Sequence, residues 1–143
     1  MKYIKMLREL SRLKKNVNRT AEQMQELQNQ KLRAMLHYAW EHSAFYRRSF
    51  EAAGISESKL DTLPLTALPT IDKSTLMEHF DELITVPGLH QEELREFDAH
   101  VEADRNPYLG KYHVVHSSGS TGTPCYFLYD EAAWSQMLLG IIR

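Results

Sequence analysis

The segment His116–Pro124, HSSGSTGTP, contains the residue types that could bind a phosphate group. Its glycines allow positive φ angles and let the backbone approach a ligand without interference from a Cβ atom. Successive N–H groups in such a turn can form a concave anion-binding nest, and nearby hydroxyls add movable donors. Composition alone leaves two interpretations open, a phosphate loop and a flexible Ser/Gly turn. Five hydroxyl side chains and two glycines fall within seven residues: Ser117, Ser118, Gly119, Ser120, Thr121, Gly122 and Thr123.

The flanks of this segment favour a strand–loop–strand arrangement. Val114 and Val115 precede it, and the apolar run 125–129 follows it. Runs of β-prone residues on both sides of a Gly/Ser/Thr cluster are typical of a hairpin. The spacing is neither that of a Walker A loop, whose lysine is absent, nor G-x-G-x-x-G, so it gives no support to a dinucleotide-binding fold.

Other residues with reactive side chains show no spacing that indicates a site. His37 and His42 are five apart on an expected helix, and His113 and His116 are three apart on an expected strand, so neither pair shares a face. We therefore predict no metal site and no catalytic residue within this chain. Cys125 has no evident base and is predicted to be a small buried residue. Four carboxylates are interpreted as helix caps and surface groups: Asp61, Asp72, Glu78 and Asp81.

The composition is that of an ordinary globular protein. The chain has 143 residues, of which 43% are hydrophobic and 25% charged, with a formal net charge of −2. This balance gives no reason to expect nucleic acid as a partner. A single cysteine excludes an internal disulfide, and neither a membrane-spanning run nor a signal peptide is visible. We expect a cytoplasmic protein.

The first segment, 1–19, is predicted to be a basic amphipathic helix. Residues 1–20 hold seven Lys/Arg and one Glu. Apolar residues recur at spacings of three and four, and we expect their stripe to dock on the protein itself, with the lysines as a solvated face. The alternative is binding to an acidic membrane surface, which we do not expect as the main partner. The stripe consists of Tyr3, Met6, Leu10, Leu13 and Val17.

The second segment, 20–110, is predicted to be mainly helical. Thr20 with Gln23 forms a capping-box pair that opens a helix through about His42. Ser43 is expected to cap the next helix and Gly54 to end it. Ser56 is expected to begin a short turn of helix, residues 63–70 to be extended because of their two prolines, and Asp72 to cap a helix reaching Phe80. The expected core comprises Trp40, Phe45, Tyr46 and Phe80, with Met35 and Leu36 on the same face of the first of these helices.

The acidic stretch 81–104 is predicted to be solvated and partly irregular, and Asn106–Pro107 with Gly110 predicts a turn. The third segment, 111–143, is predicted to be strand, loop, strand and a final helix capped by Asp130. The fold class is therefore α/β and rich in helix, with one β-hairpin that carries the Ser/Gly/Thr loop.

Three segments resemble the beginning of the adenylate-forming (AMP-binding) superfamily, in the branch of phenylacetate–coenzyme A ligases, coenzyme F390 synthetases and CapK capsular-polysaccharide proteins. The first is Gln30–Gly54, where Ala44 stands in place of the usual proline. The second is Leu68–Phe80, LPTIDKSTLMEHF, with Lys73 in the position of the branch's lysine. The third, His116–Pro124, is similar to the signature phosphate loop of the superfamily.

The resemblance implies an α-rich N-terminal fragment of the adenylate-forming ligase fold. In that family the loop holds the β- and γ-phosphates of ATP, with Mg²⁺, while a carboxylic acid becomes an acyl-adenylate for transfer, usually to coenzyme A. Here Cys125 occupies the position of the loop's usual lysine, which relatives of the phenylacetate type also often lack. By motif position the phosphate-contacting residues would be Ser117, Ser118, Gly119, Ser120, Thr121, Gly122 and Thr123.

Family members are much longer, so the resemblance predicts a chain that is inactive alone and binds neither ATP nor coenzyme A tightly. Its expected partners are the remaining C-terminal portion of the ligase or a second copy of itself. Two alternatives stay open at this point. One is a non-enzymatic helical module that binds an acidic partner or a membrane surface, and the other is a self-sufficient small phosphate-binding domain.

Overall fold

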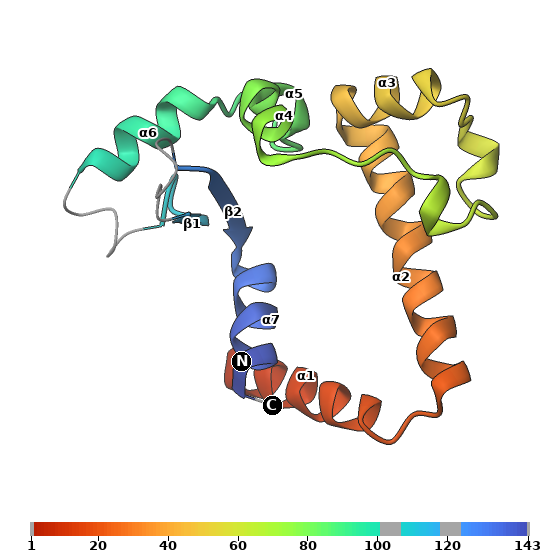
Figure 1. Cartoon of the computed structure of the whole chain (residues 1–143). Coiled ribbons are helices and arrows are strands. Elements are labelled where there is room, and N and C mark those ends of the chain that lie inside the picture. The colour runs from red at the N-terminus through yellow and green to blue at the C-terminus, as the bar shows by residue number, and fades with distance from the viewer. Residues whose placement is uncertain (1, 101–106, 118–123, 143) are drawn as a thin grey trace. The chain divides into compact units, whose positions relative to one another are not determined.

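The computed structural model describes residues 2–100, 107–117 and 124–142. It is mixed helix and strand, mostly helical, with a two-stranded antiparallel hairpin (Figure 1). Two compact units share the chain: a central unit, residues 25–91, and a terminal unit, residues 1–24 with 92–143. Within the described ranges no helix is both long and apolar enough to cross a bilayer. The elements are α1 (Lys2–Asn16), α2 (Ala21–His42), α3 (Ala44–Ala52), η1 (Glu57–Lys59), η2 (Leu65–Ala67), α4 (Lys73–Glu78), α5 (Phe80–Leu83), α6 (Gln91–Ala99), β1 (Tyr112–His116), β2 (Tyr126–Asp130) and α7 (Glu131–Ile142).

Local capping signals set most of the helix boundaries, as predicted. The Thr20 hydroxyl accepts a hydrogen bond from the Gln23 amide (3.2 Å), and the Gln23 side chain accepts one from the Thr20 amide (3.1 Å). These reciprocal bonds satisfy two N–H groups that the first turn of α2 leaves without helical partners. Asp72 accepts from the Thr75 amide at 2.8 Å and begins α4.

The end of α3 is a Schellman motif. Gly54 adopts φ 71°, its amide donates to the Glu51 carbonyl (2.9 Å), and the Ile55 amide donates to the Phe50 carbonyl (2.9 Å). A positive φ at this position favours glycine, which has no Cβ to clash. Because the reversal brings Ile55 back onto Phe50, the two side chains join the same core cluster.

The core of the central unit forms where α2, α3 and the segment after them meet. Leu60 is fully buried, and Trp40 and Tyr46 pack against its cluster, as the sequence predicted. Phe80 is also buried, and Phe45 is half-buried against the ring of His79 (5.1 Å). Met35, expected on the core face, is 67% exposed, because α2 contacts the cluster through Leu32, Leu36 and Trp40 instead. The cluster consists of Leu36, Phe50, Ile55, Leu60 and Leu63.

Two expectations for the middle of the chain need correction. Residues 65–67 form the 3₁₀ turn η2 within the stretch expected to be extended. Proline restricts only its own φ and the residue before it, so the residues between Pro64 and Pro69 can turn. The helix that begins at Asp72 stops at His79 and restarts as α5, so it does not run unbroken to Phe80.

The acidic stretch is more ordered than its composition indicated. It holds α6, whose Leu94 is fully buried, and Leu89 before it is 3% exposed. Asp81 accepts a hydrogen bond from the Gln91 amide (2.8 Å) and so caps α6 from ten residues away. Burial works against ionisation of Asp81, but the Gln91 amide and His90 outweigh it and lower its pKa. A capping residue that lies ten positions before its helix leaves no recognisable pattern in the sequence next to that helix.

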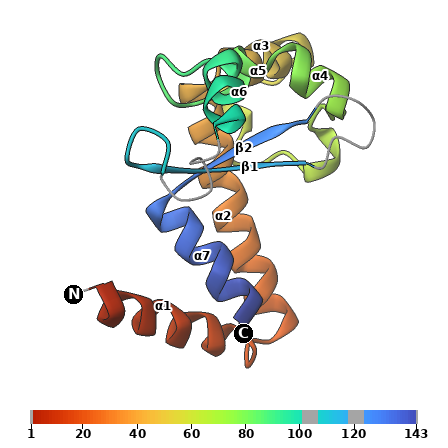
Figure 2. The same cartoon turned by 90° about the vertical axis from the view of Figure 1, so that its left-hand side faces the viewer.

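In the terminal unit, β1 and β2 pair antiparallel and β2 leads directly into α7 (Figure 2). The register aligns Tyr112 with Asp130 and His116 with Tyr126. The turn before β1 is present as predicted, with Gly110 at φ 66° and its amide bonded to the Pro107 carbonyl (2.9 Å). Asp130 accepts from the Ala133 amide (2.7 Å) and begins α7, as predicted. The strand pairing thus places residues 117–125 as the connection at one end of the hairpin.

Candidate functional site

Ser117 and Cys125 close the base of the loop that connects the two strands. The Ser117 amide donates to the Cys125 carbonyl (3.0 Å), and the Cys125 amide donates to the Ser117 hydroxyl oxygen (3.0 Å). Ser117 therefore bonds across the loop with both its backbone and its side chain. Since a hydroxyl has one proton and two lone pairs, it can still donate to a ligand while it accepts from Cys125.

The remaining six residues predicted to contact phosphate lie outside the described residues. The two ends of the loop are brought together by the bonds between Ser117 and Cys125. These six are Ser118, Gly119, Ser120, Thr121, Gly122 and Thr123. Pro124, which follows them, is half-buried, and Cys125 is 4% exposed, as predicted for a small buried residue.

His116 and Tyr126 join the base of the loop to α6. His116 Nδ1 lies 3.1 Å from the Ser117 carbonyl oxygen, which can only accept, so Nδ1 carries the proton in this contact. His116 Nε2 lies 3.6 Å from one carboxylate oxygen of Asp98, and the Tyr126 hydroxyl donates to the other (3.3 Å). A protonated His116 would bond to the Ser117 carbonyl and attract Asp98 at the same time.

The environment of Tyr126 keeps its phenol neutral. Burial is the largest cause that raises the pKa of Tyr126 above its ordinary value of 10.0, and the Asp98 carboxylate raises it further. Arg95 acts in the opposite direction but does not reverse the shift. Burial likewise raises the pKa of Tyr108, whose hydroxyl donates to Glu93 at 2.9 Å. Two tyrosines of the hairpin region are thus bonded to carboxylates of α6.

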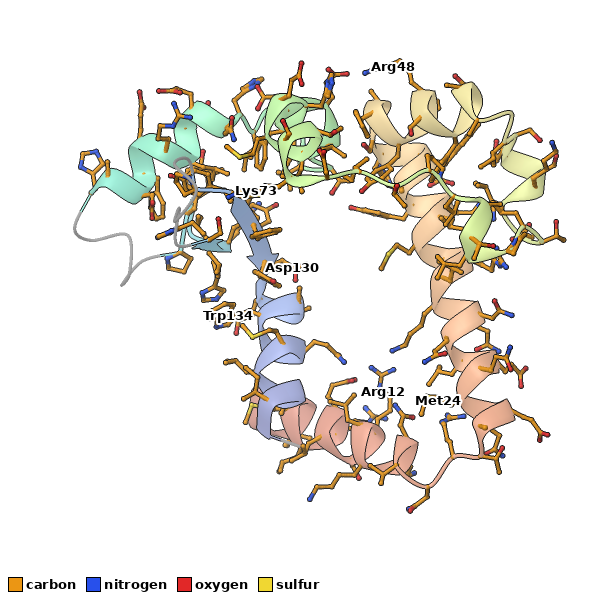
Figure 3. All side chains as sticks on the ribbon, in the orientation of Figure 1. Arg12, Met24, Arg48, Lys73, Asp130 and Trp134 are labelled. Carbon is orange, nitrogen blue, oxygen red and sulfur yellow. The ribbon has the colours of Figure 1, made fainter. Side chains whose placement is uncertain are left out.

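The other face of the hairpin is held against α7. The imidazole of His113 stacks on the indole of Trp134, with centroids 4.5 Å apart and 13° between the planes, and Tyr129 meets the same ring edge-on. Figure 3 shows Asp130 at the start of α7 and Trp134 further along it. His113 also lies 3.5 Å from Glu131. His113 and His116 therefore contact different helices, α7 and α6, rather than one shared site.

A cleft of about 960 Å³ opens in the terminal unit among α1, the turn before β1 and α7. Its lining includes Met6, Lys111 and Leu139. Three of its charged side chains are engaged locally: Glu9 pairs with Arg12 (2.8 Å), and Asp130 caps α7. Among the described residues no group of three metal-ligating side chains comes together. The loop base differs from this cleft in that the Ser117 hydroxyl accepts from Cys125 and keeps its own proton for a ligand.

Sequence reasoning did not find the Asp98–Tyr126 pair at the loop base. Asp98 lies in the acidic stretch that read as solvated, and nothing in its neighbourhood distinguishes it from the other carboxylates there. Twenty-eight positions separate the two residues. Only the packing of α6 beside the hairpin makes them partners.

Comparison of the chain with models of protein families, with curated proteins and with solved structures finds no match in any of the three.

The raised pKa of Tyr126 predicts a loss of stability at alkaline pH. A tyrosine whose pKa is higher in the folded state stabilises the fold fully below about pH 10, and this contribution disappears as the pH rises through the folded-state value. We expect the urea midpoint to fall between about pH 9 and about pH 11, and to fall less in Tyr126→Phe. Tyr108 shifts in the same direction, so part of the decrease should remain. An equal decrease in the variant and the natural protein would contradict the assignment to Tyr126.

Proposed function

We propose that this chain is the N-terminal, phosphate-binding portion of an ATP-dependent, AMP-forming ligase. The ligase would activate a carboxylic acid as an acyl-adenylate and transfer the acyl group, usually to coenzyme A. Within it, the Ser117 hydroxyl and the N–H and O–H groups of residues 118–123 would hold the β- and γ-phosphates of MgATP while the carboxylate attacks the α-phosphorus.

One observation carries the proposal: the Ser/Gly/Thr-rich segment connects two antiparallel strands and is closed at its base by Ser117 and Cys125. A phosphate loop requires fixed ends, because its donors must converge on a ligand without a large ordering cost. Further support is the order of the three segments that resemble the ligase branch, the second of which begins a helix capped by Asp72.

Binding the phosphates of ATP requires hydrogen-bond donors from the loop, and it requires neither a nucleophile nor a general base. In phosphoryl-type transfers a protein contributes mainly positioning and stabilisation of charge. Since Cys125 stands where a lysine is usual, backbone and hydroxyl donors would carry most of the contact with the phosphates.

The direct test is an NMR titration of the isotope-labelled chain with MgATP, pyrophosphate and AMP. We expect the amide signals of residues 117–123 to move with MgATP and pyrophosphate and not with AMP. The affinity should be weak, with Kd of about 1 mM or above, because phosphate contacts alone supply it. Movement confined to other residues would contradict the proposal, and micromolar binding of pyrophosphate would favour a self-sufficient phosphate-binding domain instead.

A loop variant tests whether hydroxyl donors make the contact. Ser118→Ala/Ser120→Ala/Thr121→Ala should remove the signal changes, since each lost charge-assisted donor costs on the order of 1.5–3 kcal/mol. The matched control is Ser56→Ala/Ser58→Ala, which removes two hydroxyls that lie 3.1 Å from each other in the central unit. Retained binding in the loop variant, or equal loss in the control, would count against the loop.

The 143-residue chain alone is expected to catalyse no ATP–pyrophosphate exchange. The adenine-binding segment, the ribose-binding aspartate and the catalytic lysine that the family requires have no recognisable counterpart among these residues. Exchange catalysed by the pure chain would show that these 143 residues are sufficient for catalysis, which contradicts this prediction. It would not decide whether residues 117–123 bind phosphate, which the NMR titration tests.

A further inference from the structure

The described side chains of helix α1 form two different faces, one packed within the terminal unit and one exposed. Leu13 is 7% exposed, and Met6 and Arg12 line the cleft of the terminal unit. Ile4 and Leu7 are 70% and 63% exposed. Because an α-helix has 3.6 residues per turn, positions 4, 7 and 11 share one face and position 13 lies on the opposite one. Of the apolar stripe that the sequence assigned to the protein's own core, Leu13 is buried as predicted, but Val17 is 69% exposed because it lies beyond the end of the helix. Ile4 and Leu7 lie outside that stripe and point away from the core.

The charges on the outward face are all basic. Arg8, Lys14 and Lys15 flank Ile4 and Leu7 on the helical projection, and each is exposed. Residues 1–20 hold one carboxylate, Glu9, and its side chain pairs with Arg12 beside the cleft. The outward face therefore combines aliphatic side chains with positive charge.

We propose that α1 lies flat on an anionic lipid surface. Ile4 and Leu7 would enter the boundary between headgroups and acyl chains, while Arg8, Lys14 and Lys15 reach lipid phosphates and carboxylates. Long basic side chains can bury their methylene stems and keep the charge in the polar layer. A helix of this kind rests in the interface, and its binding depends on both buried apolar area and attraction to anionic lipids.

The two exposed aliphatic residues favour a lipid surface over an acidic protein or a nucleic acid. A purely electrostatic partner would gain from the three basic residues but nothing from Ile4 and Leu7. A bilayer interface uses both, because removing aliphatic surface from water is itself favourable. None of these α1 residues belongs to the loop at residues 117–125, so the inference holds or fails independently of the proposed ligase function.

The test is co-sedimentation of the full chain with vesicles of phosphatidylcholine alone and with vesicles rich in phosphatidylserine. We expect binding to the phosphatidylserine vesicles at low salt, weak binding to phosphatidylcholine, and loss of binding as salt shortens the range of the attraction. Absence of binding to phosphatidylserine vesicles at low salt would overturn the proposal.

Two variants separate the charged from the apolar contribution. Arg8→Gln/Lys14→Gln/Lys15→Gln should lower the partition coefficient by about fivefold for each charge removed, on the order of a hundredfold in total. Ile4→Ser/Leu7→Ser keeps every charge and should also weaken binding by at least about tenfold. All five positions are exposed, so helix content by circular dichroism should be retained.

Matched controls lie in the central unit. Lys31→Gln removes an exposed basic residue from α2, and Leu65→Ser removes an aliphatic side chain that is 64% exposed. Neither should change the binding. If Ile4→Ser/Leu7→Ser binds the vesicles like the natural chain while the glutamine variant does not, the attraction is purely electrostatic, Ile4 and Leu7 do not enter the interface, and the proposal is wrong.

Discussion

Replacing Phe50 with alanine is expected to lower the free energy of unfolding of the central unit by about 3–5 kcal/mol. Phe50 is 3% exposed, and its ring lies parallel to that of Trp40 (6.4 Å, 9°) and near that of Tyr46 (5.9 Å). Truncation leaves a cavity among these rings and removes the residue on which Ile55 folds back. Domains of this size are commonly stable by only about 5–15 kcal/mol, so the unit should become marginal.

Hydrogen exchange followed by mass spectrometry would localise the effect of Phe50→Ala. Peptides from residues 25–91 should lose protection, since exchange from a buried core reports the cost of opening it. The control is Met35→Ala, in the same unit but at a side chain 67% exposed, with an expected change within about 0.5 kcal/mol. Similar losses in both variants would show that the cluster around Phe50 is not the core of this unit.

Leu94→Ala is expected to cost about 2–5 kcal/mol in the terminal unit. Leu94 is fully buried on α6, the helix that also carries Asp98 to the loop base and Glu93 to Tyr108. Loss of its side chain should therefore loosen both tyrosine contacts. Peptides covering 107–117 and 124–130 should then exchange faster, while those of the central unit change little.

The control for Leu94 is Leu7→Ala, which removes the same side chain from a position 63% exposed in the same unit. Its expected effect on unfolding is within about 0.5 kcal/mol. If the hairpin keeps the same protection from hydrogen exchange in Leu94→Ala, α6 does not stabilise the hairpin and the prediction is wrong.

Features specified by neighbouring residues could be predicted from the sequence. The capping box at Thr20, the cap at Asp72, the positive φ at Gly54 and the cap at Asp130 each depend on a few consecutive side chains. The hairpin was predictable for the same reason, because β-prone runs flank a Gly/Ser/Thr cluster.

Features that depend on distant partners could not be predicted. Helix α6 has few large apolar residues, and the contacts that order it include the buried Leu94 and the cap from Asp81, ten residues before the helix. Met35 and Leu36 occupy adjacent positions on one apolar face, and only the location of the core decides that Leu36 is buried. At the candidate site, the ends of the loop followed from the strand pattern, whereas Asp98 and Tyr126 meet through tertiary packing.

The bonds at the loop base give the chain's single thiol a particular property. Cys125 is buried, and both its amide and its carbonyl are bonded to Ser117. A cysteine reacts as a solvent-accessible thiolate, so an alkylating reagent must wait until this end of the hairpin separates. The labelling rate of Cys125 therefore measures how often the bonds between Ser117 and Cys125 open, and no cysteine has to be introduced by mutation.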